Sequence, residues 1–212
     1  MIIYWQGAGV TLYQGDFREA TIEPNSVRLV HVDPPYYKKH EDMYPACVKL
    51  AGSVLQPGGD LLSILPHWAI PQVGEWTKGS GLQWRWLVNM DQRQGSYARL
   101  VNGHRNIAVS WKPIGWWYKH GGELDYAGVI DSFENKPPKK EFHEWEQSST
   151  WADYGVLNFS QPGDLVLDPM VGSGTTLASC ITHGRRGIGI DNDEKMLEFC
   201  VMRLERLAEE TL

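Results

Sequence analysis

Short apolar runs that stop at an aspartate are the feature of this chain that most constrains its fold. The run before Asp33 is rich in β-branched residues, as a buried strand would be. Segments with helical spacing of apolar residues separate such runs, which predicts a mostly parallel, doubly wound sheet whose strands end at one edge. The runs and their aspartates are 10–15 with Asp16, 27–32 with Asp33, 165–167 with Asp168, and 186–190 with Asp191.

The remaining segments complete an α/β prediction for one domain over residues 1–212. Helices are expected at 41–55, 149–159, 175–183 and 194–210, with Ser149 or Thr150 as N-cap of the second. Further strands are expected at 61–65, 82–89 and 106–112, and residues 56–59 should stop the first helix. Residues 66–81 are interpreted as helix or loop, 92–102 as loop, and 113–148 as irregular and exposed.

The composition fits a chain with one full-sized core. Of its 212 residues, 42% are hydrophobic and 22% are charged. No apolar run approaches the roughly 20 residues of a membrane span, and the N-terminus lacks the pattern of a secretory signal. The three cysteines are far apart and odd in number, which favours reduced, buried side chains over disulfides or a zinc site. We therefore expect a cytoplasmic protein that has no metal site and no membrane partner.

Charge is distributed unevenly along the chain. The net charge is −6, yet residues 78–119 contain seven basic residues and a single acidic one. A basic segment interleaved with tryptophans suits a nucleic acid, although a solvated face over core tryptophans would look the same. The candidate nucleic-acid-binding residues are Arg93, Arg99, Arg105, Lys112 and Lys119.

A glycine-rich turn follows the run that ends at Asp168. Gly172 and Gly174 would let the backbone approach a ligand closely, and a helix starting near Thr175 would direct N–H groups toward it. Asp191, about 20 residues later, suits a ribose diol. The lysine of a phosphate-binding loop is missing, so a nucleoside without a phosphate chain, such as S-adenosylmethionine, fits better. Tight packing of the turn is the alternative reason for its glycines.

Two motifs together resemble those of the DNA amino-methyltransferases. These are Asp33-Pro34-Pro35-Tyr36 and the glycine turn 168–176, supported by residues 12–33, 143–148 and 187–191. The likeness covers roughly 10–40 and 140–205. Such enzymes move a methyl group from S-adenosylmethionine to the exocyclic amine of adenine or cytosine. The Asp-Pro-Pro-Tyr motif precedes the cofactor motif here, so the resemblance implies the circularly permuted order of the β group, on a Rossmann-like fold.

The resemblance assigns a role to each motif residue. Asp33 and the carbonyl of Pro34 would accept the two amine hydrogens, Pro35 would fix the turn, and Tyr36 would stack on an extruded base. Asp16 would meet the adenine of the cofactor, Asp168 its ammonium, and Asp191 its ribose. The implied cofactor-binding residues are Asp16, Phe17, His143, Gln147, Asp168, Pro169, Met170, Gly172, Ser173, Gly174, Thr175, Asp191 and Asn192.

The sequence departs from the family pattern at two places. Met170 stands where an aromatic residue is usual, and Gln147-Ser148 replaces Lys-Pro. Gln147 can donate a hydrogen bond but carries no charge, so either cofactor affinity is reduced or Lys139 or Lys140 takes over. Both departures concern the cofactor and leave the Asp-Pro-Pro-Tyr motif intact.

Several functions stay open at this stage. Aspartate before Pro-Pro-Tyr favours adenine N6 over cytosine N4. The candidate target-recognition segments, 90–105 and 113–148, are short, which suggests recognition of few bases, a homodimer or a second subunit. The small size suits a restriction-modification enzyme of a bacterial, phage or mobile-element host. The rivals are a non-catalytic nucleic-acid-binding module on this fold and an enzyme that methylates an amine of RNA or protein.

Overall fold

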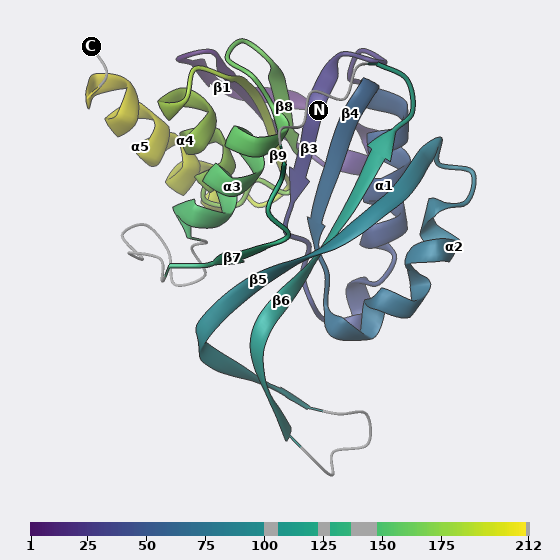
Figure 1. Ribbon diagram of the computed structural model, residues 1–212. Coiled ribbons are helices and arrows are strands. Elements are labelled where there is room, and N and C mark those ends of the chain that lie inside the picture. Colours follow the sequence, from purple (N-terminus) through teal and green to yellow (C-terminus); the bar gives the residue numbers. More distant parts are fainter. Residues whose placement is uncertain (100–105, 123–127, 137–147, 211–212) are drawn as a thin grey trace.

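A nine-stranded mixed sheet forms the centre of the computed structural model, which describes residues 1–99, 106–122, 128–136 and 148–210 (Figure 1). Its strand order within these residues is β1-β2-β9-β8-β3-β4-β6-β5-β7. The strands are β1 (Ile2–Gly7), β2 (Val10–Gln14), β3 (Val27–Val32), β4 (Leu55–Ile64), β5 (Leu82–Arg99), β6 (Asn106–Lys119), β7 (Ser132–Glu134), β8 (Leu165–Asp168) and β9 (Arg186–Asp191).

Five adjacent strands, β2, β9, β8, β3 and β4, run parallel, as the spacing of apolar runs predicts. Strands β1, β6 and β5 add antiparallel pairs at the two sides. Strand β3 carries the first motif and pairs directly with β8, which carries the second, although the two strands lie far apart in the sequence. The α/β doubly wound prediction is therefore confirmed, and the strand before the Asp-Pro-Pro-Tyr motif comes earlier in the chain than the strand before the glycine turn.

Helices cover both faces of the sheet. Figure 1 shows α3 (Ser149–Phe159), α4 (Thr175–Thr182) and α5 (Glu194–Glu210) on one face, and α1 (Met43–Val54) and α2 (Val73–Thr77) on the other. Neighbouring residues of β3 face opposite layers: Leu29 packs in the cluster under α3 to α5, whereas Val30 packs in the cluster under α1. No helix in the described ranges is long and apolar enough to cross a membrane.

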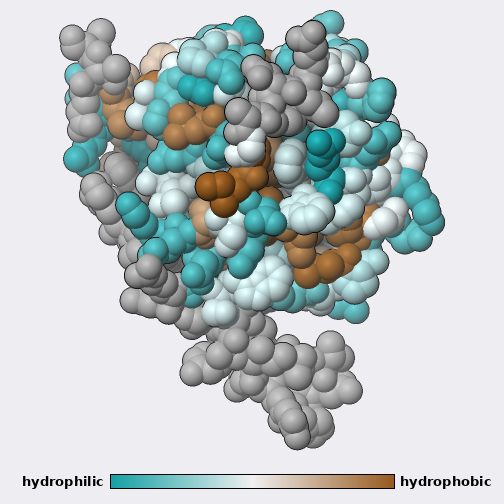
Figure 2. Space-filling view, viewed as in Figure 1, coloured by the Kyte–Doolittle hydropathy of each residue, from teal (hydrophilic) through white to brown (hydrophobic). Residues whose placement is uncertain are grey.

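The predicted helices match the structure closely. The α5 segment is identical to the predicted one, and Leu197, Cys200 and Leu204 on its apolar face are fully buried. All three cysteines are free and buried, as their number and spacing suggest. The N-cap of α3 is Ser148 rather than Ser149 or Thr150, since the Ser148 hydroxyl accepts a hydrogen bond from the Thr150 N–H. On the face in Figure 2, described apolar side chains that reach solvent form small, separate areas.

The segment predictions for the middle of the chain are wrong in three places. Strand β5 continues through residues 92–99, predicted as loop, and β6 continues to Lys119 inside the stretch predicted as irregular. Helix α1 ends before residues 56–59 as expected, but β4 begins at Leu55, so these residues belong to the strand that was predicted only for 61–65. Strands β5 and β6 pair with each other over most of their lengths and extend beyond the body as an arm (Figure 1). Pairing between strands supplies the backbone hydrogen bonds there, so no apolar alternation is needed.

Short elements and one edge strand complete the corrections. Residues 66–81 contain a 3-10 helix, His67–Gln72, followed by α2, which resolves the open choice between helix and loop. Strand β1 is not predicted from the sequence, because its side chains are mostly exposed or half-buried and it lies at the edge of the sheet. Residues 132–134 form β7 beside β5.

A buried histidine connects the sheet to two helices. The His31 ring on β3 is fully buried, with Nδ1 3.1 Å from the Thr176 hydroxyl and Nε2 3.3 Å from the Trp151 carbonyl. Burial lowers the pKa of His31 to about 3, so the ring is neutral at pH 7. Gly155 of α3 makes room for this ring: a Cβ there would lie 2.3 Å from His31 Cδ2. The helix can therefore approach β3 only where a glycine faces the ring.

Gly155→Ala tests this close approach. We expect the added methyl group to displace the ring or α3 and to lower the free energy of unfolding by about 1–3 kcal/mol. Gly74→Ala is the matched control, because Gly74 also lies in a helix, α2, and no atom lies within 4 Å of the position its Cβ would take. That control should raise stability by about 0.5–1 kcal/mol. Urea unfolding measures both, and a Gly155→Ala protein as stable as wild type would contradict the packing described here.

Candidate functional site

Four aspartates lie at or just after the carboxyl ends of the neighbouring parallel strands β2, β9, β8 and β3. A cleft opens there, and residues from both sequence motifs line it. Asp33 and Pro35 come from the turn after β3, Pro169 and Met170 from the turn after β8. The complete lining is Gly15, Asp16, Phe17, Arg18, Asp33, Pro35, Met43, Pro169, Met170, Asp191 and Asn192. The structure thus joins the two ends of the chain that the motifs occupy into one site.

The glycine turn, residues 168–176, is called the cradle from here on. Its two glycines serve different purposes. Gly174 has φ +82°, and a Cβ on it would lie 2.4 Å from the Cys200 sulfur of α5, so glycine is required there for packing and backbone conformation. Gly172 has φ +50°, and the space where its Cβ would point is open. Helix α4 begins next to them, and its N-cap, Gly174, has no side chain to occupy the first N–H groups. The turn therefore leaves room and donors for a ligand.

Asp191 is held by the backbone and keeps acceptor capacity. Its carboxylate accepts hydrogen bonds from the N–H of Gly172 and the N–H of Asp193, both at 2.9 Å. Burial raises the pKa of Asp191, and these N–H groups act against that rise. The Asn192 N–H also opposes the rise, and the carboxylate still has acceptor capacity beyond these three backbone donors, so a ribose hydroxyl could donate to it.

Asp168 ends β8, directly before the lining residues Pro169 and Met170, and is 5% exposed. Its carboxylate accepts a hydrogen bond from the Met170 N–H at 3.1 Å. Burial raises the pKa of Asp168 to about 7, hydrogen bonds from Thr176 and Met170 oppose the rise, and the charges of Asp191 and Asp33 add to it. Three neighbouring carboxyl groups that are hard to ionise favour a ligand that carries positive charge.

At the end of the cleft formed by residues 15–18, the negative charge of Asp16 is partly neutralised by Arg18. Arg18 binds the Asp16 carboxylate through Nε and Nη2, with the Nη2 to Oδ2 distance at 2.6 Å, and this hydrogen bonding lowers the pKa of Asp16. Arg18 also reaches Asp42 at 3.1 Å. Phe17 is 5% exposed but still lines the cleft. The role of Asp16 toward an adenine ring stays a prediction, since Arg18 occupies much of its acceptor capacity.

Neighbouring aromatic side chains fix the Asp-Pro-Pro-Tyr turn. The Tyr44 hydroxyl of α1 donates to the carbonyl of Pro35 at 3.1 Å, and Trp68 Nε1 donates to the carbonyl of Tyr36 at 3.2 Å. Within the described part of the chain, no donor reaches the carbonyl of Pro34, which leaves it available as an acceptor. The resemblance assigns this same carbonyl to the base amine.

The Asp33 carboxylate accepts a hydrogen bond from the Tyr36 hydroxyl. Burial raises the pKa of Asp33, whereas the positive charge of Lys112 and the Tyr36 hydrogen bond lower it. Burial, together with the adjacent Asp33 charge, raises the pKa of Tyr36, so its hydroxyl stays protonated and donates. This turn presents a carboxylate and an aromatic ring from one short segment.

The candidate nucleic-acid residues lie in different places. The Lys112 ammonium donates to the Tyr36 hydroxyl at 2.9 Å and belongs to this site rather than to an outer surface. Lys119 lies near the amino ends of the parallel strands, where it donates to Asn25 and to the carbonyl of Gly52, and its role toward a nucleic acid stays a prediction. Arg93 and Arg99 belong to the arm strand β5, whose side chains there are not described. Arg105, His143 and Gln147, together with Lys139 and Lys140, lie outside the described residues.

Sequence reasoning missed several residues of the site. Arg18 is two residues from Asp16, which is predicted to bind the cofactor. A basic residue so close in sequence could have indicated that it pairs with the Asp16 carboxylate. Met43 of α1 lines the cleft, and Tyr44 and Trp68 hold the turn by contacts between segments far apart in the chain. No local sequence pattern predicts such contacts.

A family model for DNA methylases matches residues 82–202, more than half of the chain. Among curated proteins, the DNA adenine methyltransferase YhdJ of Escherichia coli K12 is 35% identical over 121 residues, 56% of this chain and 38% of that protein. The type II methyltransferase M.HpaI of Haemophilus parainfluenzae is 46% identical over 109 residues, 51% of this chain and 30% of that protein. The match thus spans less than half the length of either relative.

Solved structures share the fold along nearly the whole chain. TTHA0409 of Thermus thermophilus, described as a putative DNA modification methylase, has a TM-score of 0.72, 23% identity and coverage of 94% of both chains. The PvuII DNA methyltransferase, described as cytosine-N4-specific, has a TM-score of 0.77, 14% identity and coverage of 98% of this chain and 94% of that one. With two motifs at one cleft of this fold and the family match over residues 82–202, the chain belongs to the N6/N4 DNA methylase family.

Proposed function

We propose that this chain transfers a methyl group from S-adenosylmethionine to the N6 amine of adenine in DNA, after the base leaves the helix. One observation carries the proposal: Asp33 and the cradle residues around Met170 and Asp191 line the same cleft. An amine bound at Asp33 and a nucleoside bound at Met170 and Asp191 would therefore lie next to each other. Proximity of this kind is a large part of enzymatic rate enhancement.

The residues of the cradle fit S-adenosylmethionine. Asp191 keeps lone pairs for the ribose hydroxyls, the open space beside Gly172 admits a ligand, and the buried Asp168 suits an ammonium group. Phe17 and Met170 add apolar surface for the adenine ring. When bound, the cofactor supplies an electrophilic methyl group on a positively charged sulfur. The M1.HpyAVI structure, described as a complex with this cofactor, shares the fold with a TM-score of 0.73 and 17% identity, and covers 92% of this chain and 98% of that one.

The acceptors of the catalytic turn explain how the base amine is activated. The lone pair of such an amine is delocalised into the ring, which makes the nitrogen a poor nucleophile. If the Asp33 carboxylate and the Pro34 carbonyl each accept one amine hydrogen, the nitrogen becomes more tetrahedral and its lone pair is released. With the cofactor bound, this nitrogen would take the methyl group as the sulfur–carbon bond breaks. The methylated amine would then release one proton to solvent, leaving S-adenosylhomocysteine.

The position of the turn supports the proposal that the base is extruded. Pro34 is buried, and Asp33 lies at the wall of the cleft, where the amine of a base stacked in a duplex does not reach. The Tyr36 ring offers a flat face against which a flipped base can stack. The arm of β5 and β6, which carries Arg93 and Arg99, would contact the DNA backbone and select the site, alone or with a second subunit or copy.

Adenine is favoured over cytosine by the residue at position 33 and by one relative. Aspartate before Pro-Pro-Tyr is the form that leans toward adenine, and YhdJ is described as a DNA adenine methyltransferase. The fold is shared with a cytosine-N4-specific enzyme, so N4 of cytosine is the alternative product.

Methyl-labelled S-adenosylmethionine tests the substrate class and the base. We expect label in duplex DNA of varied sequence and none in RNA or in peptides. Digestion of the DNA to nucleosides should then give N6-methyladenine. N4-methylcytosine would replace the base assignment, whereas label only in RNA or peptide, or in no substrate, would overturn the proposed function.

Asp33→Ala tests the role of the catalytic carboxylate. We expect methyl transfer to fall by at least about 10²-fold, because one of two amine acceptors is lost. Cofactor affinity, measured by isothermal titration calorimetry, should stay within about threefold, since Asp191 and the cradle hold the nucleoside. Glu75→Ala, on the exposed face of α2, is the control and should keep full activity. Turnover retained by Asp33→Ala would remove this residue from the mechanism.

A further inference from the structure

Lys112 places a positive charge inside the catalytic site from the arm side of the sheet. It lies on β6 opposite Met90 of β5, between Trp111 and the buried Pro113. The Trp111 ring contacts the His67 ring edge-on, with centroids 4.8 Å apart, which holds this part of β6 against the 3-10 helix. The lysine is thus anchored on both sides in a part of the strand that borders the Asp-Pro-Pro-Tyr turn.

The Lys112 ammonium makes two contacts with one tyrosine. Its Nζ donates to the Tyr36 hydroxyl at 2.9 Å and lies 4.6 Å from the centre of the Tyr36 ring. The same hydroxyl donates to the Asp33 carboxylate. An ammonium, a hydroxyl and a carboxylate therefore form one hydrogen-bonded series, in which the hydroxyl accepts from the first and donates to the last.

This hydrogen-bonded series affects the reaction, given the proposed function on which the inference rests. A base amine that binds Asp33 competes with the Tyr36 hydroxyl for the carboxylate. When the hydroxyl loses Asp33 as its acceptor, it still accepts from Lys112, so the ring keeps a fixed point. The stacking face then stays in place while the carboxylate changes partner.

We propose that Lys112 is a positioning residue for methyl transfer, which holds the Tyr36 ring for stacking and places a positive charge beside the Asp33 carboxyl group. Lys112 is also one of the nucleic-acid-binding residues predicted from the sequence, and its ammonium is directed at a tyrosine inside the site rather than at an outer surface. A phosphate would have to compete with that hydroxyl and with the nearby Asp33.

The groups that face Asp33 set the direction of the pH effect. They are Lys112 of β6, Tyr36 of the same turn, Tyr44 of α1 and Asp168 of β8. Only Lys112 among them is a cation. Burial raises the pKa of Asp33 and the lysine charge lowers it, so loss of this charge raises it further. Less carboxylate is then present at a given pH, and the acid limb of the pH–rate profile moves to higher pH.

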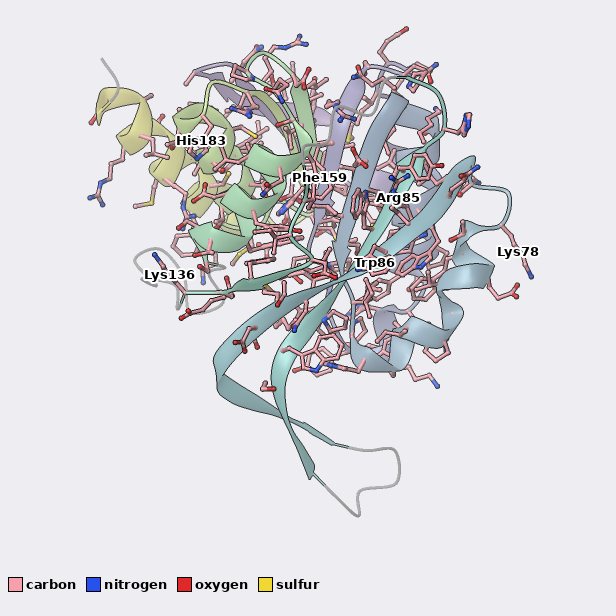
Figure 3. All side chains as sticks on the ribbon, viewed as in Figure 1. Lys78, Arg85, Trp86, Lys136, Phe159 and His183 are labelled. Carbon is pink, nitrogen blue, oxygen red and sulfur yellow. The ribbon has the colours of Figure 1, made fainter. Side chains whose placement is uncertain are left out.

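Lys112→Met removes the charge at nearly constant length, and Lys112→Arg keeps it. At saturating cofactor, we expect the methionine variant to lose about 10–100-fold in kcat at pH 7, with a smaller change in KM for DNA. Its acid limb should move up by about one pH unit. The arginine variant should recover most of the rate and the wild-type limb. Lys78→Met is the control, because Lys78 follows α2 and points away from the body (Figure 3).

A double-mutant cycle tests whether the lysine acts through the tyrosine. Tyr36→Phe removes the hydroxyl and keeps the ring. In the double variant Lys112→Met with Tyr36→Phe, the rise in activation free energy obtained from kcat should be smaller than the sum of the rises in the two single variants. Additive effects would show that Lys112 acts elsewhere, and would overturn the positioning role.

Two readouts distinguish the alternatives without relying on turnover. Carbon-13 NMR titration of the Asp33 carboxyl should give a higher pKa in Lys112→Met than in wild type, even if the wild-type protein methylates no DNA. The salt dependence of DNA binding should be unchanged, whereas a phosphate contact predicts a slope smaller by about one. If Lys112→Met fails to fold, Lys112→Gln takes its place in the same titration, and Lys112→Arg, which keeps the charge, is the control that should leave the Asp33 pKa unchanged. An Asp33 pKa that does not rise when the lysine charge is removed would contradict the inference.

Discussion

Parallel pairing of β2, β9, β8 and β3 is the constraint on which the site depends. It places the ends of four strands side by side, so that Asp16, Asp191, Asp168 and Asp33 meet at one edge although they are spread over most of the chain. The hydrogen-bond register fixes these positions before any ligand is considered. The cleft between the turns follows from this pairing, and both motifs reach it because β3 and β8 are direct neighbours.

Burying several carboxylates close together costs free energy, and hydrogen bonds and a positive charge from the surrounding residues offset part of this cost. Backbone N–H groups of Gly172, Asp193 and Met170 donate to Asp191 and Asp168, and Arg18 neutralises Asp16. Asp168 and Asp33 are still harder to ionise than free aspartates, because burial outweighs their partners. A ligand with an ammonium and a sulfonium would compensate such a site, which agrees with the proposed cofactor. Lys112 supplies the compensating charge on the other side, where the base would bind.

Local patterns in the sequence predict the parts of the fold that local residues determine. Runs ending at Asp33, Asp168 and Asp191, and the helices α4 and α5, follow from hydrophobic spacing and turn residues. The full length of β5 and β6 does not, because the two strands continue by pairing with each other, and pairing between distant segments leaves no local sequence pattern. Contacts between distant segments are unpredictable for the same reason. Three contacts depend on packing between segments far apart in the sequence. They are the His31 ring against Gly155, the hydrogen bonds of Tyr44 and Trp68 to the Asp-Pro-Pro-Tyr turn, and the hydrogen bond of Lys112 to Tyr36.

A crystal structure with S-adenosylhomocysteine, the methyl-free form of the cofactor, tests the central claim most directly. The claim is that the cofactor and the reacting base share the cleft that the parallel strand ends create. The expected result is the nucleoside in this cleft, with ribose hydroxyls on Asp191 and the sulfur on the side of Asp33. A ligand bound elsewhere, or in the cleft with its sulfur directed away from Asp33, would contradict the account.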